Sequence, residues 1–129
     1  MMKTKLFTAH DYPTNDSGHC GVPLDERIND FINYYAKNII DIKFSTSVAS
    51  VESNYPRSRD FCEEALLIYE PIANLTTHYM YIRLPYTRAE IQKNFDEEMK
   101  WWAESGYHII YYELRHKFDS YPYGIVVFQ

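Results

Sequence analysis

The feature that most constrains the fold is a pair of amphipathic helical segments, each set among strand-like segments in the same order. Leu24, Ile28 and Phe31 recur at the spacing of one helical face, and Ile91 and Phe95 begin a second stripe of the same kind. In both halves of the chain, one strand-like segment precedes the helix and two follow it. A helix with one apolar face must bury that face against another layer. The sequence therefore predicts an α+β fold built from two strand–helix–strand–strand units.

The predicted elements cover most of the 129 residues. The first helix should begin at Pro23 and end near Asn38, and the second should begin at Thr87 and end before Gly106. The predicted strands are 3–8, 40–45, 65–69, 79–84, 107–115 and 123–128, with a polar connection over 45–60. We expect these strands to form an antiparallel sheet with the two helices on one face.

We expect a single domain, residues 1–129, because the length suits one compact core. The first unit spans 1–71 and contains an inserted loop at 11–21, and the second unit spans 72–129. The two halves share little residue identity, so the inferred repetition depends on the order and length of the elements. Chance similarity between two α+β patterns is the alternative.

Charge and hydropathy limit which kinds of partner the protein is expected to bind and where in the cell it is expected to act. The formal net charge is −5 and the isoelectric point is about 5.5, which disfavours direct binding to nucleic acid. The N-terminal residues do not resemble a signal peptide. No segment approaches the roughly 20 apolar residues that a membrane span requires. We therefore expect a cytoplasmic protein that contacts neither membrane nor nucleic acid.

Aromatic residues suggest a binding surface. The chain has 13 tyrosines, a residue type that is enriched at protein interfaces. The alternative explanation for the many tyrosines is that their rings fill a thin hydrophobic core. Trp101 lies about 100° around the second helix from Trp102, so either Trp101 is exposed to a partner or both tryptophans pack between the helices. The predicted partner-binding residues are Trp101, Tyr107, Tyr111 and Tyr121.

A cluster of possible metal ligands lies in the first unit. The predicted topology brings His10, His19, Cys20 and Cys62 to one end of that unit. Thiolate and imidazole are the usual ligands of zinc, so a structural zinc ion is one prediction. Free buried thiols are the alternative, since the chain has no CxxC pair. A further hypothesis is a nucleophilic cysteine, Cys20, paired with His10 or His19. No catalytic motif accompanies this pair in the sequence. We therefore expect a protein that is not an enzyme.

Two resemblances to known families add further expectations. The runs IIDIKFSTS at 39–47 and EEALLIYEP at 63–71, with Lys3, Lys5 and Phe7 in a KxKxF-type strand, resemble a family of small sporulation-associated proteins from spore-forming bacteria and their phages. The doubled element order is similar to the tandem modules of GyrI-like proteins. The second resemblance implies small-molecule binding in the groove between two modules.

The leading expectation is a non-enzymatic, protein-binding inhibitor of phage or mobile-element origin, as many small acidic phage proteins are. Its most specific form is an anti-CRISPR protein that occupies a host CRISPR effector, acting as a monomer or homodimer. The alternatives are a small-molecule-binding domain of GyrI-like architecture and a sporulation accessory protein.

Overall fold

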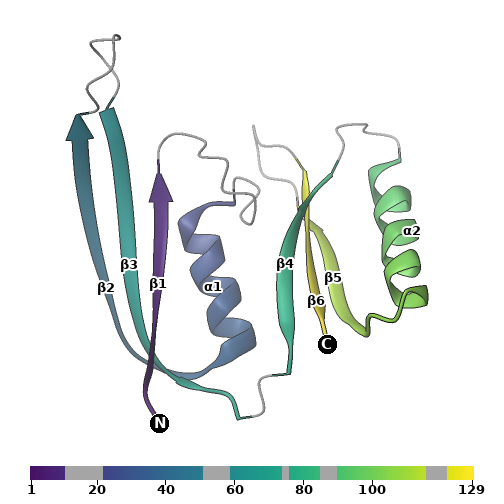
Figure 1. Ribbon diagram of the computed structural model, residues 1–129, viewed down its shortest axis with the longest axis horizontal. Helices are drawn as coiled ribbons and strands as arrows, with labels where there is room; N and C mark the ends of the chain where they lie inside the picture. The colour runs from purple at the N-terminus through teal and green to yellow at the C-terminus, as the bar shows by residue number, and fades with distance from the viewer. Residues whose placement is uncertain (11–21, 51–58, 74–75, 85–89, 116–121) are drawn as a thin grey trace. The chain divides into compact units, whose positions relative to one another are not determined.

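The computed structural model of the protein describes residues 1–10, 22–50, 59–73, 76–84, 90–115 and 122–129. Eight elements follow one another in this part of the chain (Figure 1): β1 (Lys3–His10), α1 (Leu24–Tyr35), β2 (Ala36–Ser50), β3 (Arg59–Pro71), β4 (His78–Arg83), α2 (Ile91–Glu104), β5 (Ile109–Arg115) and β6 (Tyr123–Phe128). Their contacts place the described residues up to 73 in a first unit and those from Thr76 onward in a second unit.

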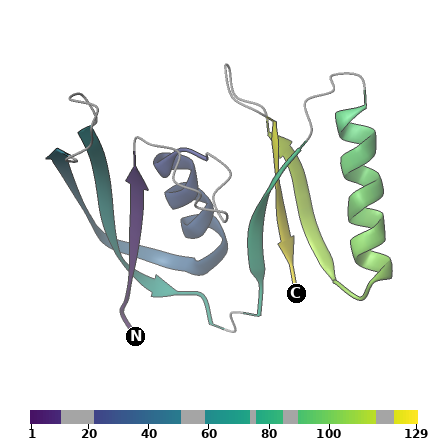
Figure 2. The same ribbon diagram turned by 45° about the horizontal axis from the view of Figure 1, so that its top comes forward.

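The predicted α+β class is confirmed, and each unit has the strand–helix–strand–strand order. The strands form two three-stranded antiparallel sheets, one in each unit, where a single sheet was expected. The strand order is β1-β3-β2 in the first unit and β4-β6-β5 in the second. In each unit the last strand hydrogen-bonds to both of the others, so each unit completes a sheet of its own. One helix packs on one face of each sheet (Figure 2).

The first unit differs from its predicted boundaries in the β2–β3 hairpin. α1 ends at Tyr35, three residues before the predicted end near Asn38, and β2 begins at the next residue. The ladder continues through Ser45↔Glu64 to Ser50↔Arg59, so much of the expected polar connection is strand. Both strands extend past the end of β1 (Figure 1). Polar residues can occupy a paired strand because the backbone makes the ladder hydrogen bonds, so apolar alternation gives no signal there.

The core of the first unit is centred on Phe31 of α1. Its ring lies 5.5 Å from that of Phe7 on β1 and 5.1 Å from that of Tyr69 on β3, both edge to face. Ala65 and Leu67 of β3 are fully buried beneath the helix. The Arg27 guanidinium donates a hydrogen bond of 2.5 Å to the Thr8 carbonyl oxygen, which ties α1 to β1. These contacts hold α1 toward the β1 side of the sheet.

The second unit has a core of its own. Leu84, Phe95, Met99 and Val126 form its buried cluster. Phe95 packs directly on Gly124 of β6, where an added Cβ would collide with its ring. Every residue of β6 from Tyr123 to Val127 is buried, as expected for the central strand of the sheet.

The C-terminus of α2 is closed by a Schellman motif. The Gly106 N–H donates to the Ala103 carbonyl and the Tyr107 N–H donates to the Trp102 carbonyl, both at 3.2 Å. Gly106 has φ 105°, a conformation that glycine adopts without a Cβ penalty. The Tyr107 ring then packs 5.3 Å from the Trp102 ring, the apolar contact that accompanies this motif. The predicted helix stop at Gly106 therefore has a defined backbone cause.

The two units share details beyond element order. Both strands that follow a helix carry a bulge at an Ile-Ile pair, Ile39-Ile40 in β2 and Ile109-Ile110 in β5. Four apolar positions have the same spacing in the two helices: Leu24, Ile28, Ile32 and Tyr35 match Ile91, Phe95, Met99 and Trp102, whereas Phe31 falls at the position of Glu98. These equivalences allow the units to be compared position by position. No helix in the described ranges is long and apolar enough to cross a membrane.

Candidate protein-binding groove

An apolar groove of about 630 Å³ lies between α1 and β2 in the first unit. We call it the α1–β2 groove. Its helix wall consists of Pro23, Leu24, Asp25, Ile28, Asn29 and Ile32. Its strand wall consists of Ala9, Ile42, Phe44 and Glu63. The groove lies where α1, which contacts both β1 and β2, leaves Phe44 of β2 exposed.

Phe44 is the most unusual side chain in this groove. It lies on the helix-facing side of the sheet, opposite Ala65 in the β2–β3 ladder, yet it is 66% exposed. Ile42, two residues earlier on the same face, is half-buried. A large aromatic side chain on the core side of a sheet normally contributes to burial. Here it forms an apolar wall that is open to solvent.

The charged groups that line the groove are acidic. Asp25 is in the first turn of α1, and Glu63 is on β3 opposite Ala9. Both carboxylates belong to exposed residues at the edges of the apolar floor. Among the described lining residues there is no Lys, Arg or His. The described lining therefore combines an apolar centre with two carboxylates.

The second unit fills the equivalent position. Phe95 takes the place of Ile28, and Tyr112, opposite Val126, takes the place of Ile42, opposite Leu67. The Phe95 and Tyr112 rings pack edge to face at 5.2 Å. Two larger side chains thus occupy the volume that two isoleucines leave open in the first unit.

A hydrogen bond fixes this closed arrangement. The Tyr112 hydroxyl donates to Asp96 Oδ1 on α2 at 2.9 Å, and Gln92 Nε2 donates to the same oxygen at 2.9 Å. This hydrogen bond, with smaller contributions from burial and from the Asp96 charge, raises the pKa of Tyr112 above its ordinary value. Asn29 stands at the position of Asp96 in the first unit, and Ile42 has no hydroxyl to bond to it. The first unit therefore lacks the cross-link between helix and strand.

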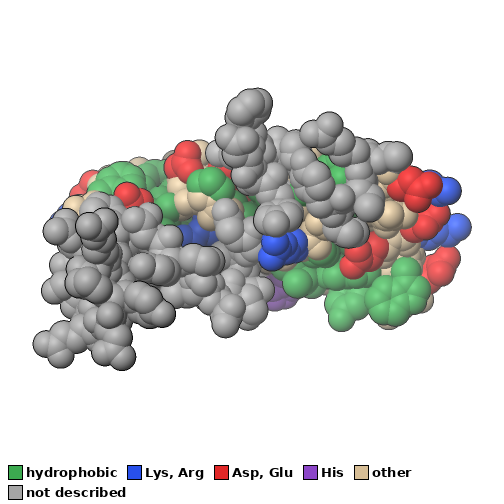
Figure 3. Space-filling model, turned by 90° about the horizontal axis from the view of Figure 1, so that it is seen from above, with side chains coloured by type: hydrophobic (Ala, Val, Ile, Leu, Met, Phe, Trp, Pro, Cys, Tyr) green, Lys and Arg blue, Asp and Glu red, His purple; other side chains and the backbone are tan. Residues whose placement is uncertain are grey.

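A smaller hollow of about 460 Å³ remains between α2 and β5, nearer the C-terminal end of α2. Its lining includes Met99, Lys100, Ile110 and Tyr111. Acidic and basic side chains gather over the α2 end of the molecule, beside hydrophobic ones (Figure 3). The described lining of this hollow carries both signs of charge, Asp96 and Lys100.

Three of the four predicted partner-binding residues lie in described parts of the second unit. Trp101 is 64% exposed, Tyr107 is 49% exposed and Tyr111 is 43% exposed. Tyr121 lies outside the described residues.

The geometry of α2 separates Trp101 from the hollow that Tyr111 lines. Trp101 is about 160° around α2 from Ala103, which lines the hollow beside Tyr111. Tyr107 packs on Trp102 and Phe128, at 5.3 Å and 5.8 Å between ring centroids.

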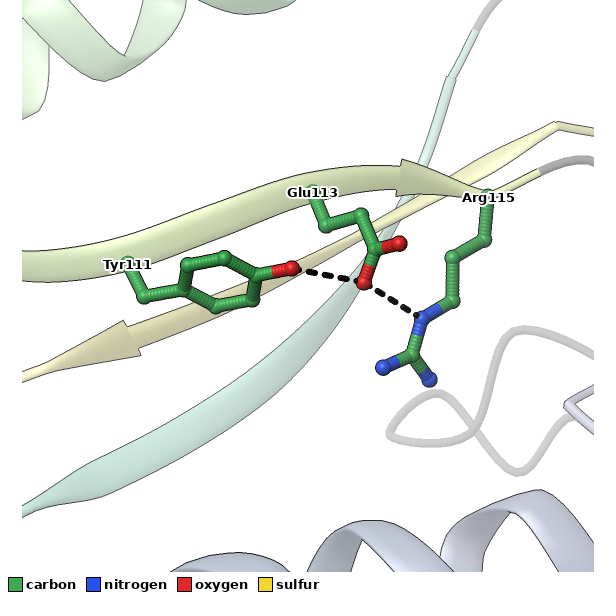
Figure 4. Close-up of polar contacts among 3 residues, drawn as sticks. All are labelled: Tyr111, Glu113 and Arg115. Carbon is green, nitrogen blue, oxygen red and sulfur yellow. Dashed lines mark hydrogen bonds and ion pairs between the residues drawn. The ribbon is translucent and has the colours of Figure 1, made fainter.

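Tyr111 is engaged along its own strand. Its hydroxyl donates to Glu113 Oε2 at 2.8 Å, and Arg115 Nε contacts the same oxygen at 3.4 Å (Figure 4). The three residues alternate along β5, so their side chains share one face of the sheet. The Tyr111 hydroxyl is therefore part of a polar row along β5.

The predicted zinc ligands are only partly described. The β1–β3 register places the backbone of His10 opposite that of Cys62, so two of the four residues occupy paired positions at the end of β1. His19 and Cys20 lie outside the described residues. Within the described part of the chain, no three His, Cys, Asp or Glu residues are arranged to hold a metal ion. The zinc site therefore stays a prediction.

Sequence reasoning missed the groove. Ile42 and Phe44 alternate with Asp41 and Lys43, a pattern that predicts a half-buried strand and so predicts burial of both apolar side chains. The sequence signal for the groove is the smaller size of Ile28 and Ile42 compared with Phe95 and Tyr112, and it becomes visible only once the two units are aligned.

Comparison of this chain with protein-family models, with curated proteins and with solved structures found no match.

Proposed function

We propose that this protein acts in the cytoplasm as a non-enzymatic, protein-binding domain, and that the α1–β2 groove is its binding site. The observation that carries the proposal is the exposure of Phe44 within an apolar groove of about 630 Å³. Aromatic side chains in apolar hollows are typical anchors of protein–protein interfaces. Burying Phe44 and Ile42 against a partner would remove apolar surface from water, which favours association.

A specific form of the proposal concerns the partner. The small size and net charge of −5 favour an inhibitor of phage or mobile-element origin that occupies a host protein, such as a CRISPR effector. This form predicts that the purified protein inhibits cleavage by its target effector at stoichiometric concentration. Unchanged cleavage across a panel of effectors would remove this form and leave the binding function to be tested separately.

Small-molecule binding is the second candidate function. The groove volume falls within the range of about 300–1,000 Å³ that is typical of ligand pockets. Such pockets bury most of the ligand surface, whereas the 66% exposure of Phe44 indicates an open wall. A protein partner can cover an open wall, so the geometry favours the first candidate. A thermal shift with a metabolite, lost in Phe44→Ser, would favour the second.

The test of the proposed function compares two exposed apolar residues on opposite faces of the same sheet. Leu6 is 54% exposed on the face away from α1, and so provides a matched control for Phe44. Wild type, Phe44→Ser and Leu6→Ser are immobilised, and retained host proteins are identified by mass spectrometry. We expect a protein that wild type and Leu6→Ser retain and Phe44→Ser loses. Equal recovery with Phe44→Ser would contradict the proposal.

A second variant closes the groove without removing apolar surface. Ile42→Tyr with Asn29→Asp transfers the Tyr112–Asp96 cross-link into the first unit. We expect this double variant to fold and to lose the same partner that Phe44→Ser loses. Retention of the partner at wild-type affinity would show that the volume between α1 and β2 is not the binding site.

A further inference from the structure

β2 forms one edge of the sheet in the first unit (Figure 1). The strand order is β1-β3-β2, so among the described strands β2 pairs on one side only, with β3. From residue 39 to residue 46 every side chain except that of Ile42 is exposed. An edge strand presents a row of backbone N–H and C=O groups that can pair with a strand of another chain. The open edge of β2 can therefore accept a further strand.

The charged side chains of this edge are complementary to a second copy of themselves. Asp41 and Lys43 are exposed and lie two residues apart, on the same face of the strand. If two copies of β2 pair antiparallel around a two-fold axis at Ile42, Asp41 of each copy lies opposite Lys43 of the other. Opposite charges at directly opposed positions stabilise strand pairing. In the single chain the Asp41 carboxylate accepts a hydrogen bond of 2.8 Å from the Ile42 N–H, a bond that a backbone pair with the second copy would replace.

The same register brings exposed apolar side chains together. Phe44 of one copy comes beside Ile40 of the other, and the two copies of Ile42 lie opposite each other. Phe44 is 66% exposed and Ile40 is 49% exposed in the single chain. Cross-strand pairs of an aromatic and a β-branched side chain stabilise sheets. Both the charged and the apolar side chains therefore favour an axis at Ile42.

Neighbouring registers do not match in this way. An axis at Asp41 or at Lys43 places that charged residue opposite its own copy, and like charges directly opposite each other are destabilising. An axis at Phe44 places Lys43 opposite Ser45 and so forms no ion pair. The strand at the other edge of the sheet, β1, carries two lysines and no acidic residue, so it lacks the self-complementary pattern.

We propose that this protein forms a homodimer in which the open β2 edges of two copies pair antiparallel around Ile42. A two-fold axis that relates antiparallel neighbours in one sheet is perpendicular to that sheet, so α1 of both copies lies on the same face. The two α1–β2 grooves then lie side by side along the paired strands. The inference concerns assembly and does not depend on the proposed binding function.

Sedimentation velocity of the full-length protein at low salt measures the equilibrium between monomer and dimer. Five paired residues per strand, 40–44, make a small interface, so we expect a weak dimer whose fraction rises with concentration. Asp41→Lys and Lys43→Asp each place like charges opposite each other, and each should raise the dissociation constant of the dimer about tenfold. Lys93→Asp makes the same change of net charge as Lys43→Asp at an exposed position of α2, and should leave this constant within about twofold.

Two combinations of these variants test the register itself. The double variant Asp41→Lys with Lys43→Asp exchanges the charges, keeps the net charge and should restore wild-type dimerisation. An equimolar mixture of the two single variants should form a mixed dimer, because each chain then presents the charges that the other lacks. A misfolded variant would give neither result.

Three outcomes would overturn the inference. The first is a protein that stays monomeric up to about 1 mM. The second is a dimer that Lys43→Asp and Lys93→Asp weaken equally, because net charge would then explain the effect. The third is a dimer that neither the double variant nor the mixture restores. Retention of the partner by Asp41→Lys and its loss by Phe44→Ser would support the proposed function whether or not the dimer forms.

Discussion

Replacement of Gly124 by Ala tests how the second unit is packed. An added Cβ would lie 2.8 Å from Cε2 and 3.0 Å from Cε1 of Phe95, whereas carbon atoms in contact ordinarily lie 3.5–4.0 Å apart. Phe95 is fully buried and also packs on Tyr112, so its ring has little room to move. Such overpacking costs about 1–3 kcal/mol, and we expect a value near the upper limit.

A smaller gain offsets part of this cost. Ala is about 0.5–1 kcal/mol more favourable than Gly within a strand, because Gly loses more conformational freedom on folding. The net loss of unfolding free energy is therefore about 2 kcal/mol. With an m-value of about 1–2 kcal/mol/M, the urea midpoint falls by about 1–2 M. Both tryptophans of the chain lie on α2, so tryptophan fluorescence reports unfolding of this unit.

A double variant separates the collision from other effects of the substitution. Phe95→Leu removes the ring atoms that meet the added Cβ, so Gly124→Ala should cost much less in that background, with a coupling energy of about 1 kcal/mol or more. Ala65 holds the equivalent strand position in the first unit, where α1 carries the smaller Ile28. Wild-type stability of Gly124→Ala, or strict additivity of the two changes, would refute the reasoning.

Three further predictions concern other parts of the fold. Tyr112→Phe should lower the unfolding free energy by about 1 kcal/mol. Asp96 raises the pKa of Tyr112 above that of the unfolded chain. The stability difference between wild type and Tyr112→Phe should therefore be complete below about pH 10 and disappear as the pH rises through the folded-state pKa. A stability difference that does not change with pH in urea titrations would contradict this prediction. Gly106→Ala should cost about 1–2 kcal/mol by forcing an alanine to φ 105°, and an unchanged melting temperature would refute the strain. If His10 and Cys62 ligate zinc, purified protein should contain one zinc ion per chain and melt at lower temperature with chelator, and absence of both effects would exclude the site.

The order of the elements was predictable because apolar residues recur in the sequence at the spacing of a helix or a strand. The stripe from Ile91 to Trp102 and the stop at Gly106 placed α2 correctly at its C-terminus. The outer parts of β2 and β3 were missed because Ser45, Thr46 and Ser47 carry no apolar alternation, although their backbones pair with β3. Strand pairing between distant segments supplies the hydrogen bonds there, and no local pattern encodes it.

The α1–β2 groove could not be predicted from either half alone. Its existence depends on the lateral position of α1 over the sheet, which is fixed by the Phe31 aromatic contacts and by the Arg27 hydrogen bond to the β1 backbone. Those contacts join residues far apart in the sequence. The groove brings several apolar residues together around Phe44, which the pattern of neither half indicates.

The central claim is that the α1–β2 groove is where this protein binds its partner. The most direct measurement is a titration of isotope-labelled protein with the partner that wild type and Leu6→Ser retain and Phe44→Ser loses, followed by backbone amide chemical shifts. We predict the largest shifts at residues 24–32 of α1 and 42–44 of β2, with the signals of 3–6 and 91–104 nearly unchanged. The largest shifts at 91–104, or at Leu6 and its neighbours on the opposite face of the sheet, would contradict the claim.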